Sequence, residues 1–246
     1  MIGELIARSE LSHDDVGEMY RLFRTHFERV SEQRFREDLD EKHWVIRIRD
    51  RATLHGFSSL RFMRTGSGAS ALNVLYSGDT IVAPEARGTT VLARTWIDGV
   101  RRLSDYYGTS ELYWLLLVSG FRTYRLLPVF WKEFFPQHSR ETPPGVRSTI
   151  ESVSKLVFGS AYSAPEGIVR FPEPQPLRPE LGHIPEGRLQ DPHVQFFASL
   201  NPGHSAGDEL VCWTRLAQDN LTEAGARMWR AGDVTALREA AASEVR

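Results

Sequence analysis

Residues 71–107 read ALNVLYSGDTIVAPEARGTTVLARTWIDGVRRLSDYY, and this stretch decides the fold. Its first part, residues 71–82, is apolar and contains several β-branched side chains, which is typical of a strand. A small polar segment at Ser77 and Gly78 predicts an interruption within that strand. Pro84 ends the strand, because a proline nitrogen has no hydrogen to donate to a β-ladder.

The second part of the stretch predicts an amphipathic helix that starts after a tight turn at Gly88. Apolar side chains recur every three or four residues along one face, at Leu92, Trp96, Val100, Leu103 and Tyr107. The first amides of a helix lack partners within it and lie at the positive end of its dipole, so this turn suits a phosphate group. Gly88 has no Cβ to keep a phosphate away, and the hydroxyl of Thr89 or Thr90 can cap the helix or bind the anion.

Residues 81–100, IVAPEARGTTVLARTWIDGV, resemble the strand-loop-helix core of the GCN5-related N-acetyltransferases (GNAT), whose usual pattern is V-x-P-x-x-R-G-x-G-x-G/A. The matching positions are Val82, Pro84, Arg87 and Gly88. Thr90 stands at the second glycine of the pattern and Leu92 at its third glycine or alanine, so the loop is degenerate. The resemblance ends near residue 140.

In that family the loop holds the pyrophosphate of acetyl-CoA. The resemblance therefore implies acetyl-CoA or another acyl-CoA as cosubstrate, bound by Ile81, Val82, Arg87, Gly88, Thr89 and Thr90. A short glycine motif is a weak signal by itself, and the other interpretation is an ordinary strand-turn-helix connection without a ligand.

Periodicity upstream of the loop predicts a strand, two helices and two strands before the central strand. This order is also the one that the resemblance implies. We therefore expect an α/β fold with a GNAT-like mixed, mostly antiparallel central sheet flanked by helices, and with a C-terminal extension. Residues 1–140 form the predicted acyltransferase core and residues 141–246 the extension, packed on the core and able to add a strand at 209–216.

The extension contains six prolines between Pro172 and Pro192, which predict an irregular segment that wraps a surface or links two parts. Residues 221–245 are rich in alanine, arginine and glutamate and predict a helical tail. Such a tail is compatible with a homodimer contact or with simple exposure to solvent.

Composition excludes several classes of protein. The chain has 246 residues, a formal net charge of −2, and 41% hydrophobic residues, which suffice for a packed core. This charge gives no sign of binding to nucleic acid or to an anionic membrane. Cys212 is the single cysteine, and the N-terminus is too polar for a signal peptide, so we expect a cytoplasmic protein. The eight histidines show no spacing typical of a metal site, so no metal ligands are predicted.

Acyl transfer to an amine needs a base for the ammonium proton and an acid for the thiolate that leaves. Asp79 lies on the central strand just before the loop, and Glu111 begins the next strand, so either is a candidate base. The resemblance implies a general-acid tyrosine on a later helix. Tyr124 is the candidate, although the usual spacing is absent and a packed aromatic is the plainer interpretation. The aromatic residues able to line an apolar acyl or acceptor pocket are Tyr76, Trp114, Tyr124 and Trp131.

These observations predict an N-acyltransferase that transfers an acyl group, most simply acetyl, from acyl-CoA to an amine of a small molecule or peptide. Two alternatives stay open. One is an acyltransferase that uses acyl carrier protein or a long-chain acyl donor, in which a weakened pyrophosphate loop matters less. The other is a non-catalytic GNAT-like module that binds a ligand or partner.

Overall fold

A computed structural model of the chain describes residues 1–51, 53–66, 68 and 71–230. The predicted helical tail reaches into residues 231–246, which lie outside the described residues. The strands are β1 Ile2–Ala7, β2 Trp44–Asp50, β3 Thr53–Thr65, β4 Leu72–Val82, β5 Leu112–Val118, β6 Tyr162–Ser163, β7 Ile168–Val169 and β8 Glu209–Arg215. The helices are α1 His13–Phe23, α2 Glu32–Asp40, α3 Val91–Tyr106, α4 Phe121–Tyr124, α5 Leu126–Phe130, α6 Pro144–Phe158, α7 Pro179–Gly182, α8 Pro192–Leu200 and α9 Glu223–Arg230.

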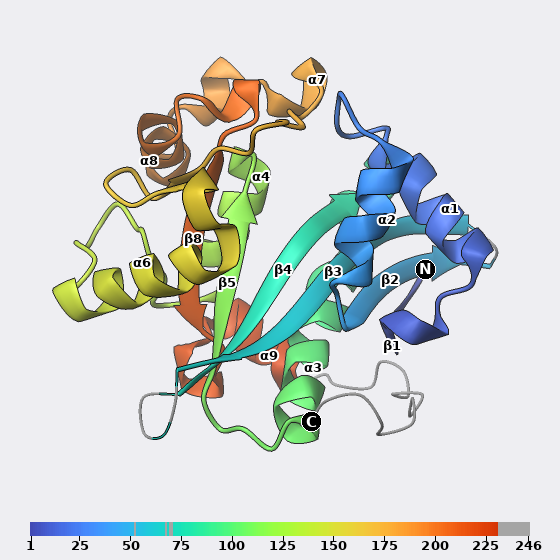
Figure 1. The fold of residues 1–246 in the computed structure, drawn as a ribbon, viewed down its shortest axis with the longest axis horizontal. Helices are drawn as coiled ribbons and strands as arrows, with labels where there is room; N and C mark the ends of the chain where they lie inside the picture. Colours follow the sequence, from blue (N-terminus) through green and yellow to red (C-terminus); the bar gives the residue numbers. More distant parts are fainter. Residues whose placement is uncertain (52, 67, 69–70, 231–246) are drawn as a thin grey trace.

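The strands of the described residues form one sheet in the order β1-β2-β3-β4-β5-β8-β7-β6. β4 and β5 are parallel, and the other neighbouring pairs are antiparallel (Figure 1). The predicted fold class, an α/β protein with a mixed and mostly antiparallel sheet flanked by helices, is therefore confirmed. β4 and β5 can run parallel because α3 crosses over between them, as a parallel pair requires.

Local sequence explains where the first helices begin. Ser12 and Asp15 form a reciprocal capping box at α1. The Asp15 amide donates to the Ser12 hydroxyl at 3.1 Å, and the Ser12 amide donates to the Asp15 carboxylate at 3.0 Å. Ser31 caps α2 through a 3.1 Å bond from the Arg34 amide. Thr90 occupies the N-cap position of α3, but its side chain makes no capping hydrogen bond.

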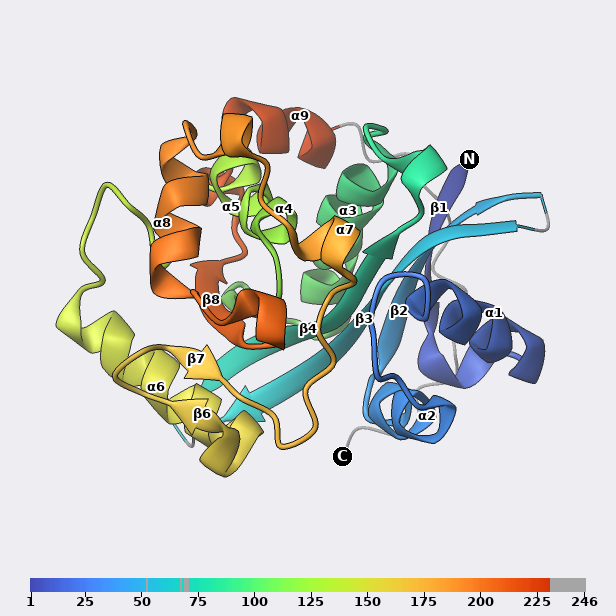
Figure 2. The ribbon, with the colours of Figure 1, turned by 90° about the horizontal axis from the view of Figure 1, so that it is seen from above.

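Helices cover both faces of the sheet (Figure 2). On one face, α3, α4, α5 and α8 pack on the largest apolar core, which includes Trp96, Trp114 and Tyr124. On the other face, α1 and α2 pack against β1 to β4 through residues such as Met19 and Phe57. α6 covers β4, β5 and β8 on the same face as α1 and α2.

Residues after 141 take part in the sheet. β8 pairs with β5 from Tyr113–Arg215 to Val118–Leu210, and β7 and β6 follow at the edge. The segment from Pro172 to Pro192 is mostly irregular and contains the short α7. None of the helices within the described ranges combines the length and apolarity needed to cross a membrane.

Candidate functional site

The central strands β4 and β5 separate halfway along their length. Their pairing runs from Asn73–Leu112 to Ser77–Leu116, and both strands then continue without further pairing to each other. The separation begins where β4 has a bulge, since Ser58 pairs with Thr80 but Leu60 pairs with Ser77. β4 itself runs unbroken from Leu72 to Val82, so a bulge stands where the sequence predicted an interruption at Ser77 and Gly78, and the sheet opens at this point.

A pocket of about 870 Å³ occupies this opening and reaches both faces of the sheet. It lies at the upper end of the range of roughly 300–1,000 Å³ that is usual for small-molecule sites. Gly78 lies at this bulge, where a Cβ would come within 2.8 Å of Cε of the buried Lys42. Since Gly78 also lines the pocket, the pocket starts at the bulge.

Residues 173–178 cross over the pocket on the side of α1 and α2. Their backbone is held by hydrogen bonds from the Glu28 amide to the Pro176 carbonyl, 2.9 Å, and from the Arg178 amide to the His26 carbonyl, 2.8 Å. Leu177 of this segment lines the pocket and lies against the turn between β5 and α4, where a Cβ on Gly120 would approach Leu177 to 2.8 Å. The proline-rich segment thus forms part of the wall of the pocket.

Three arginines line one end of the pocket. Arg87 comes from the loop before α3, Arg122 from α4, and Arg188 from the proline-rich segment. Partial loss of solvent around its guanidinium, together with repulsion from Arg87 and Arg188, lowers the pKa of Arg122. Among the described residues, none of the three forms an ion pair with a carboxylate, although Arg122 donates a hydrogen bond of 2.5 Å to the Leu181 carbonyl. Arg125, which also lines the pocket, binds Asp191 at 2.9 Å. Three clustered guanidinium groups without carboxylate partners suit a phosphorylated ligand.

The loop before α3 has the backbone that a close ligand contact requires. Gly88 has φ of +83°, and a Cβ at this position would meet no atom within 4 Å, so the space beside it is open. Thr89 donates its hydroxyl to the Ala86 carbonyl at 2.9 Å, and Thr90 is exposed. The N-terminus of α3 therefore faces the arginine end of the pocket with an uncovered loop.

Acidic side chains lie on the other side of the opening. Glu209, at the start of β8, accepts a hydrogen bond of 3.0 Å from the Ser119 hydroxyl, and burial raises the pKa of Glu209 to about 7. Burial, with the neighbouring Asp38, raises the pKa of Asp79 to about 8. Within the described part of the chain, Asp79 has no hydrogen-bond or ion-pair partner. Both carboxylates line the pocket, where a group with a pKa near neutrality can take up a proton.

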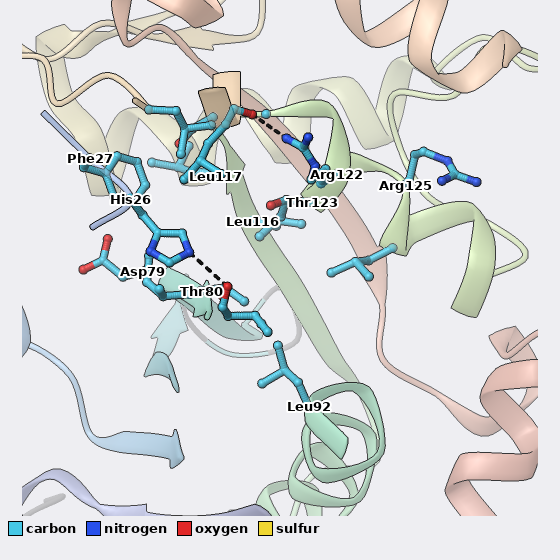
Figure 3. A pocket seen from close by; sticks show the side chains of 18 of the residues that line it. His26, Phe27, Asp79, Thr80, Leu92, Leu116, Leu117, Arg122, Thr123 and Arg125 are labelled. Carbon is cyan, nitrogen blue, oxygen red and sulfur yellow. Dashed lines mark hydrogen bonds between the residues drawn. The ribbon is translucent and has the colours of Figure 1, made fainter. Parts of the chain in front are cut away.

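His26 lies between the arginine end and the carboxylate side of the pocket. Its Nε2 lies 3.0 Å from the Val82 carbonyl oxygen and 3.4 Å from a guanidinium nitrogen of Arg87. Burial lowers the pKa of His26, so the imidazole is neutral at pH 7 and can donate to the Val82 carbonyl. Figure 3 shows His26 and Asp79 on one side of the pocket, and Arg122 and Arg125 across from them.

The structure brings most of the predicted cofactor residues to this pocket. Five of the six line it, namely Ile81, Val82, Arg87, Gly88 and Thr89, while Thr90 does not. Asp79 also lines the pocket. Tyr124 is fully buried and donates its hydroxyl to the Pro136 carbonyl at 2.8 Å, so it does not reach the pocket. Glu111 is exposed at the opposite end of β5, where β4 and β5 are still paired.

Several pocket residues were not singled out in the sequence. Glu209, Arg122 and Arg188 come from three separate segments, and no local motif surrounds any of them. Glu209 stands at the start of the strand predicted at 209–216, which is the one feature that could have drawn attention to it. Its pairing with Ser119 joins residues 90 positions apart, and local patterns carry no information on such contacts.

No protein-family model matches the sequence, and the search of curated proteins gave no match. Solved structures of GNAT-type proteins are similar at low identity. A probable N-acyltransferase of unknown function from Enterococcus faecalis has a TM-score of 0.41 and 14% identity over 55% of this chain. The match spans 33% of that protein's length.

Two further solved structures are similar at the same level. The ribosomal-protein alanine N-acetyltransferase from Escherichia coli has a TM-score of 0.39 and 10% identity, and the match covers 88% of this chain and 95% of that one. A GNAT family acetyltransferase from Brucella melitensis in complex with acetyl-CoA has a TM-score of 0.34 and 10% identity over 46% of this chain and 74% of that one. At these scores the similarities carry no argument about activity, which rests on the geometry of the pocket.

Proposed function

We propose that the protein is an N-acyltransferase that moves an acyl group from acyl-CoA to an amine. The observation that carries this proposal is the pocket through the separated strands β4 and β5, which has arginines at one end and raised-pKa carboxylates on the other side. The arginine end fits the phosphates of the donor, and the carboxylate side fits the amine. A thioester held between them lies beside the free edge of β4.

The donor is held by charge and by backbone groups. Arg87, Arg122 and the N-terminal amides of α3 are placed to bind the pyrophosphate of CoA, and Arg188 adds a third positive charge. The pantetheine arm then runs into the opening. Beyond the bulge, β4 has lost its partner β5, so its backbone groups near Thr80 can bond to the amides of pantetheine or to the thioester carbonyl.

The reaction needs one proton to be removed from the ammonium group before attack. Glu209 is the base that we favour, because its pKa of about 7 matches this task and Ser119 fixes its position. The free amine attacks the thioester carbonyl carbon, the new C–N bond forms, and the C–S bond breaks. The nitrogen then loses its second proton, and the CoA thiolate that leaves takes up this proton. Asp79, whose pKa is raised to about 8, is a second carboxylate of the pocket that can accept a proton.

A second candidate donor is an acyl carrier protein, which presents the same pantetheine arm. The observation that favours it is the exposure of Arg87, Arg122 and Arg188, because exposed arginines suit an acidic protein surface as well as a nucleotide. The departure from the glycine pattern at Thr90 and Leu92 points the same way. The acceptor in either case is a small-molecule or peptide amine.

Binding and turnover together test the proposal. Acetyl-CoA should raise the melting midpoint, since a ligand at about 100 times its Kd stabilises the native state by about 2.7 kcal/mol. Thiol release from acetyl-CoA should then increase when a panel of primary amines is added. Binding of acetyl-CoA without amine-dependent thiol release would favour the non-catalytic alternative. No shift with CoA, but a shift with an acylated carrier protein, would favour the second donor.

A further inference from the structure

The pocket has an arm that the transfer of an acetyl group does not use. The arm extends from the opening beneath α3, between that helix and the sheet, and is lined by Ile48, Leu92, Ala93, Trp96, Ile97 and Trp114. Leu92 and Trp96 are four residues apart on α3, as are Ala93 and Ile97, so two adjacent stripes of the helix face the arm. Figure 3 shows Leu92 projecting from α3 toward the pocket. We call this space the apolar arm.

The inner end of the apolar arm lies in the interior of the protein. Ile48 and Ile97 are each 2% exposed and Trp114 is 5% exposed, yet all three line the pocket. Gly56 on β3 lies beside Ile48, because a Cβ at Gly56 would lie 2.8 Å from the Ile81 carbonyl oxygen and 3.7 Å from Cγ1 of Ile48.

The walls of the apolar arm are aromatic and carry no charge. The ring centroids of Trp96 and Trp114 are 4.1 Å apart, and Trp131 lies 6.4 Å from Trp114. The indole N–H of Trp114 is already bonded to the Ser77 hydroxyl at 2.8 Å. On the following turns of α3, Val100 and Leu103 are fully buried in the core and close the arm. These walls carry no charged side chain that would bind a phosphate.

An apolar space of this kind is costly to leave without an occupant. Buried side chains that face a void lose dispersion contacts, because protein interiors are otherwise packed as densely as organic crystals. The arm begins at the free edge of β4, where the thioester lies in the proposed function. The carboxylates Asp79 and Glu209 lie on the other side of the opening, so the amine approaches from there and the arm is left for the acyl group.

We propose that the apolar arm binds the aliphatic chain of the acyl donor, and that the substrate is a thioester with an acyl group considerably longer than acetyl. This inference rests on the proposed function, because it requires a thioester in the opening. The inference concerns the length of the acyl chain and not its carrier. It applies to CoA and to carrier protein alike, since both present the acyl group on pantetheine.

The test compares acetyl and decanoyl thioesters of pantetheine and of CoA by calorimetry. The decanoyl thioester should bind at least about tenfold more tightly than the acetyl thioester, because two buried methylene groups already contribute that factor. The ratio of decanoyl to acetyl affinity should be the same for the pantetheine thioesters as for the CoA thioesters, because the acyl chain occupies the same arm in both. Equal affinity for acetyl and decanoyl thioesters would overturn the inference.

A pair of variants locates the effect. Ala93→Phe fills the apolar arm from a partly exposed position on α3 and should abolish the preference for decanoyl. Ala198→Phe makes the same change on a partly exposed face of α8, outside the pocket, and should keep the preference. If Ala93→Phe does not fold, Ala93→Leu should reduce the preference in part. A preference that survives in both Ala93 variants would also overturn the inference.

The outcomes separate this inference from the proposed function. If CoA esters bind without regard to chain length, the acyl-CoA site stands and the role of the apolar arm is wrong. If decanoyl-pantetheine binds tightly and CoA adds no affinity, the arm stands and the arginine site for CoA is wrong. If no thioester binds at all, both are wrong.

Discussion

The Ser119 hydroxyl donates a hydrogen bond of 3.0 Å to the carboxylate of Glu209, and this bond links the end of β5 to the start of β8 at the edge of the pocket. Ser119 follows the strand that separates from β4, while Glu209 begins the strand that pairs with β5 on its other side. The contact therefore places a carboxylate of raised pKa beside the opening. It also ties the chemistry of the pocket to the C-terminal part of the chain.

Glu209 should make the stability of the protein depend on pH. Burial raises the pKa of Glu209 from 4.5 to about 7, so between these values the folded protein keeps a proton that the unfolded chain has released. The free energy of unfolding should therefore fall as pH rises from about 5 to 8, and Glu209→Gln should reduce this fall by about 1–3 kcal/mol. Urea unfolding at a series of pH values measures it.

The matched control for this experiment is Glu111→Gln, which removes an exposed carboxylate outside the pocket. It should leave the slope of stability against pH as in the original protein. Equal slopes for Glu209→Gln and the original protein would mean that Glu209 ionises normally. In that case Asp79, whose pKa is raised to about 8, would become the preferred base.

The arginine end of the pocket should bind phosphate in a manner that depends on salt. Replacing both Arg122 and Arg188 by glutamine should weaken CoA binding by about a hundredfold, since a charge-assisted hydrogen bond contributes about 1.5–3 kcal/mol. The double variant should also lose much of the dependence of affinity on ionic strength. Affinity for S-acetyl-pantetheine, which has no nucleotide, should change far less.

Arg94→Gln serves as the control for that pair, because Arg94 is exposed on α3 and does not line the pocket. Its effect on CoA affinity measures how much the loss of one positive charge near the site matters when no contact to the ligand is removed. If Arg94→Gln weakens CoA binding as much as Arg122→Gln alone, the effect is one of net charge, and the assignment of a specific phosphate site is wrong.

The loop before α3 offers two opposite substitutions. Gly88→Val should lower the melting midpoint, because φ of +83° costs a β-branched residue at least about 1–2 kcal/mol. It should also abolish CoA binding, since a shifted backbone no longer directs its amides at the pyrophosphate. Thr90→Gly should leave stability almost unchanged, because the Thr90 side chain makes no capping bond and glycine is an acceptable N-cap residue.

Thr90→Gly also brings the loop closer to the GNAT pattern, so CoA affinity should be kept or increased. Differential scanning fluorimetry and calorimetry on both variants provide the two readouts. Loss of CoA binding in a folded Thr90→Gly protein would show that the threonine hydroxyl itself binds the ligand. Unchanged CoA affinity in Gly88→Val would mean that the loop is an ordinary connection.

Tyr124 should contribute to stability and not to proton transfer. Tyr124→Phe removes the 2.8 Å bond to the Pro136 carbonyl and should lower the free energy of unfolding by about 1–2 kcal/mol. The dependence of the transfer rate on pH should keep its shape, because the hydroxyl does not reach the pocket. A large fall in rate with unchanged stability would instead support the general-acid role suggested by the resemblance.

Much of the fold follows from local patterns in the sequence. The apolar and β-branched composition of residues 72–82, the turn at Gly88 and the apolar stripe from Leu92 to Leu103 specify β4, the loop and α3, because the stripe has the helix period and the turn requires a positive φ. The same patterns place Asp79 and Arg87 at the pocket, since both lie within a few residues of the turn.

Tertiary structure alone decided which distant residues meet at this site. Tyr124 is the candidate acid that the resemblance implies, and Glu111 is a candidate base because it begins a predicted strand. In the structure Tyr124 turns into the core and Glu111 lies at the paired end of β5. Glu209, Arg122 and Arg188 reach the pocket only because β8 pairs with β5 and the proline-rich segment folds over the opening. Periodicity in the sequence shows on which face of a helix or strand a residue lies. Which residues pack against that face depends on how separate segments of the chain come together.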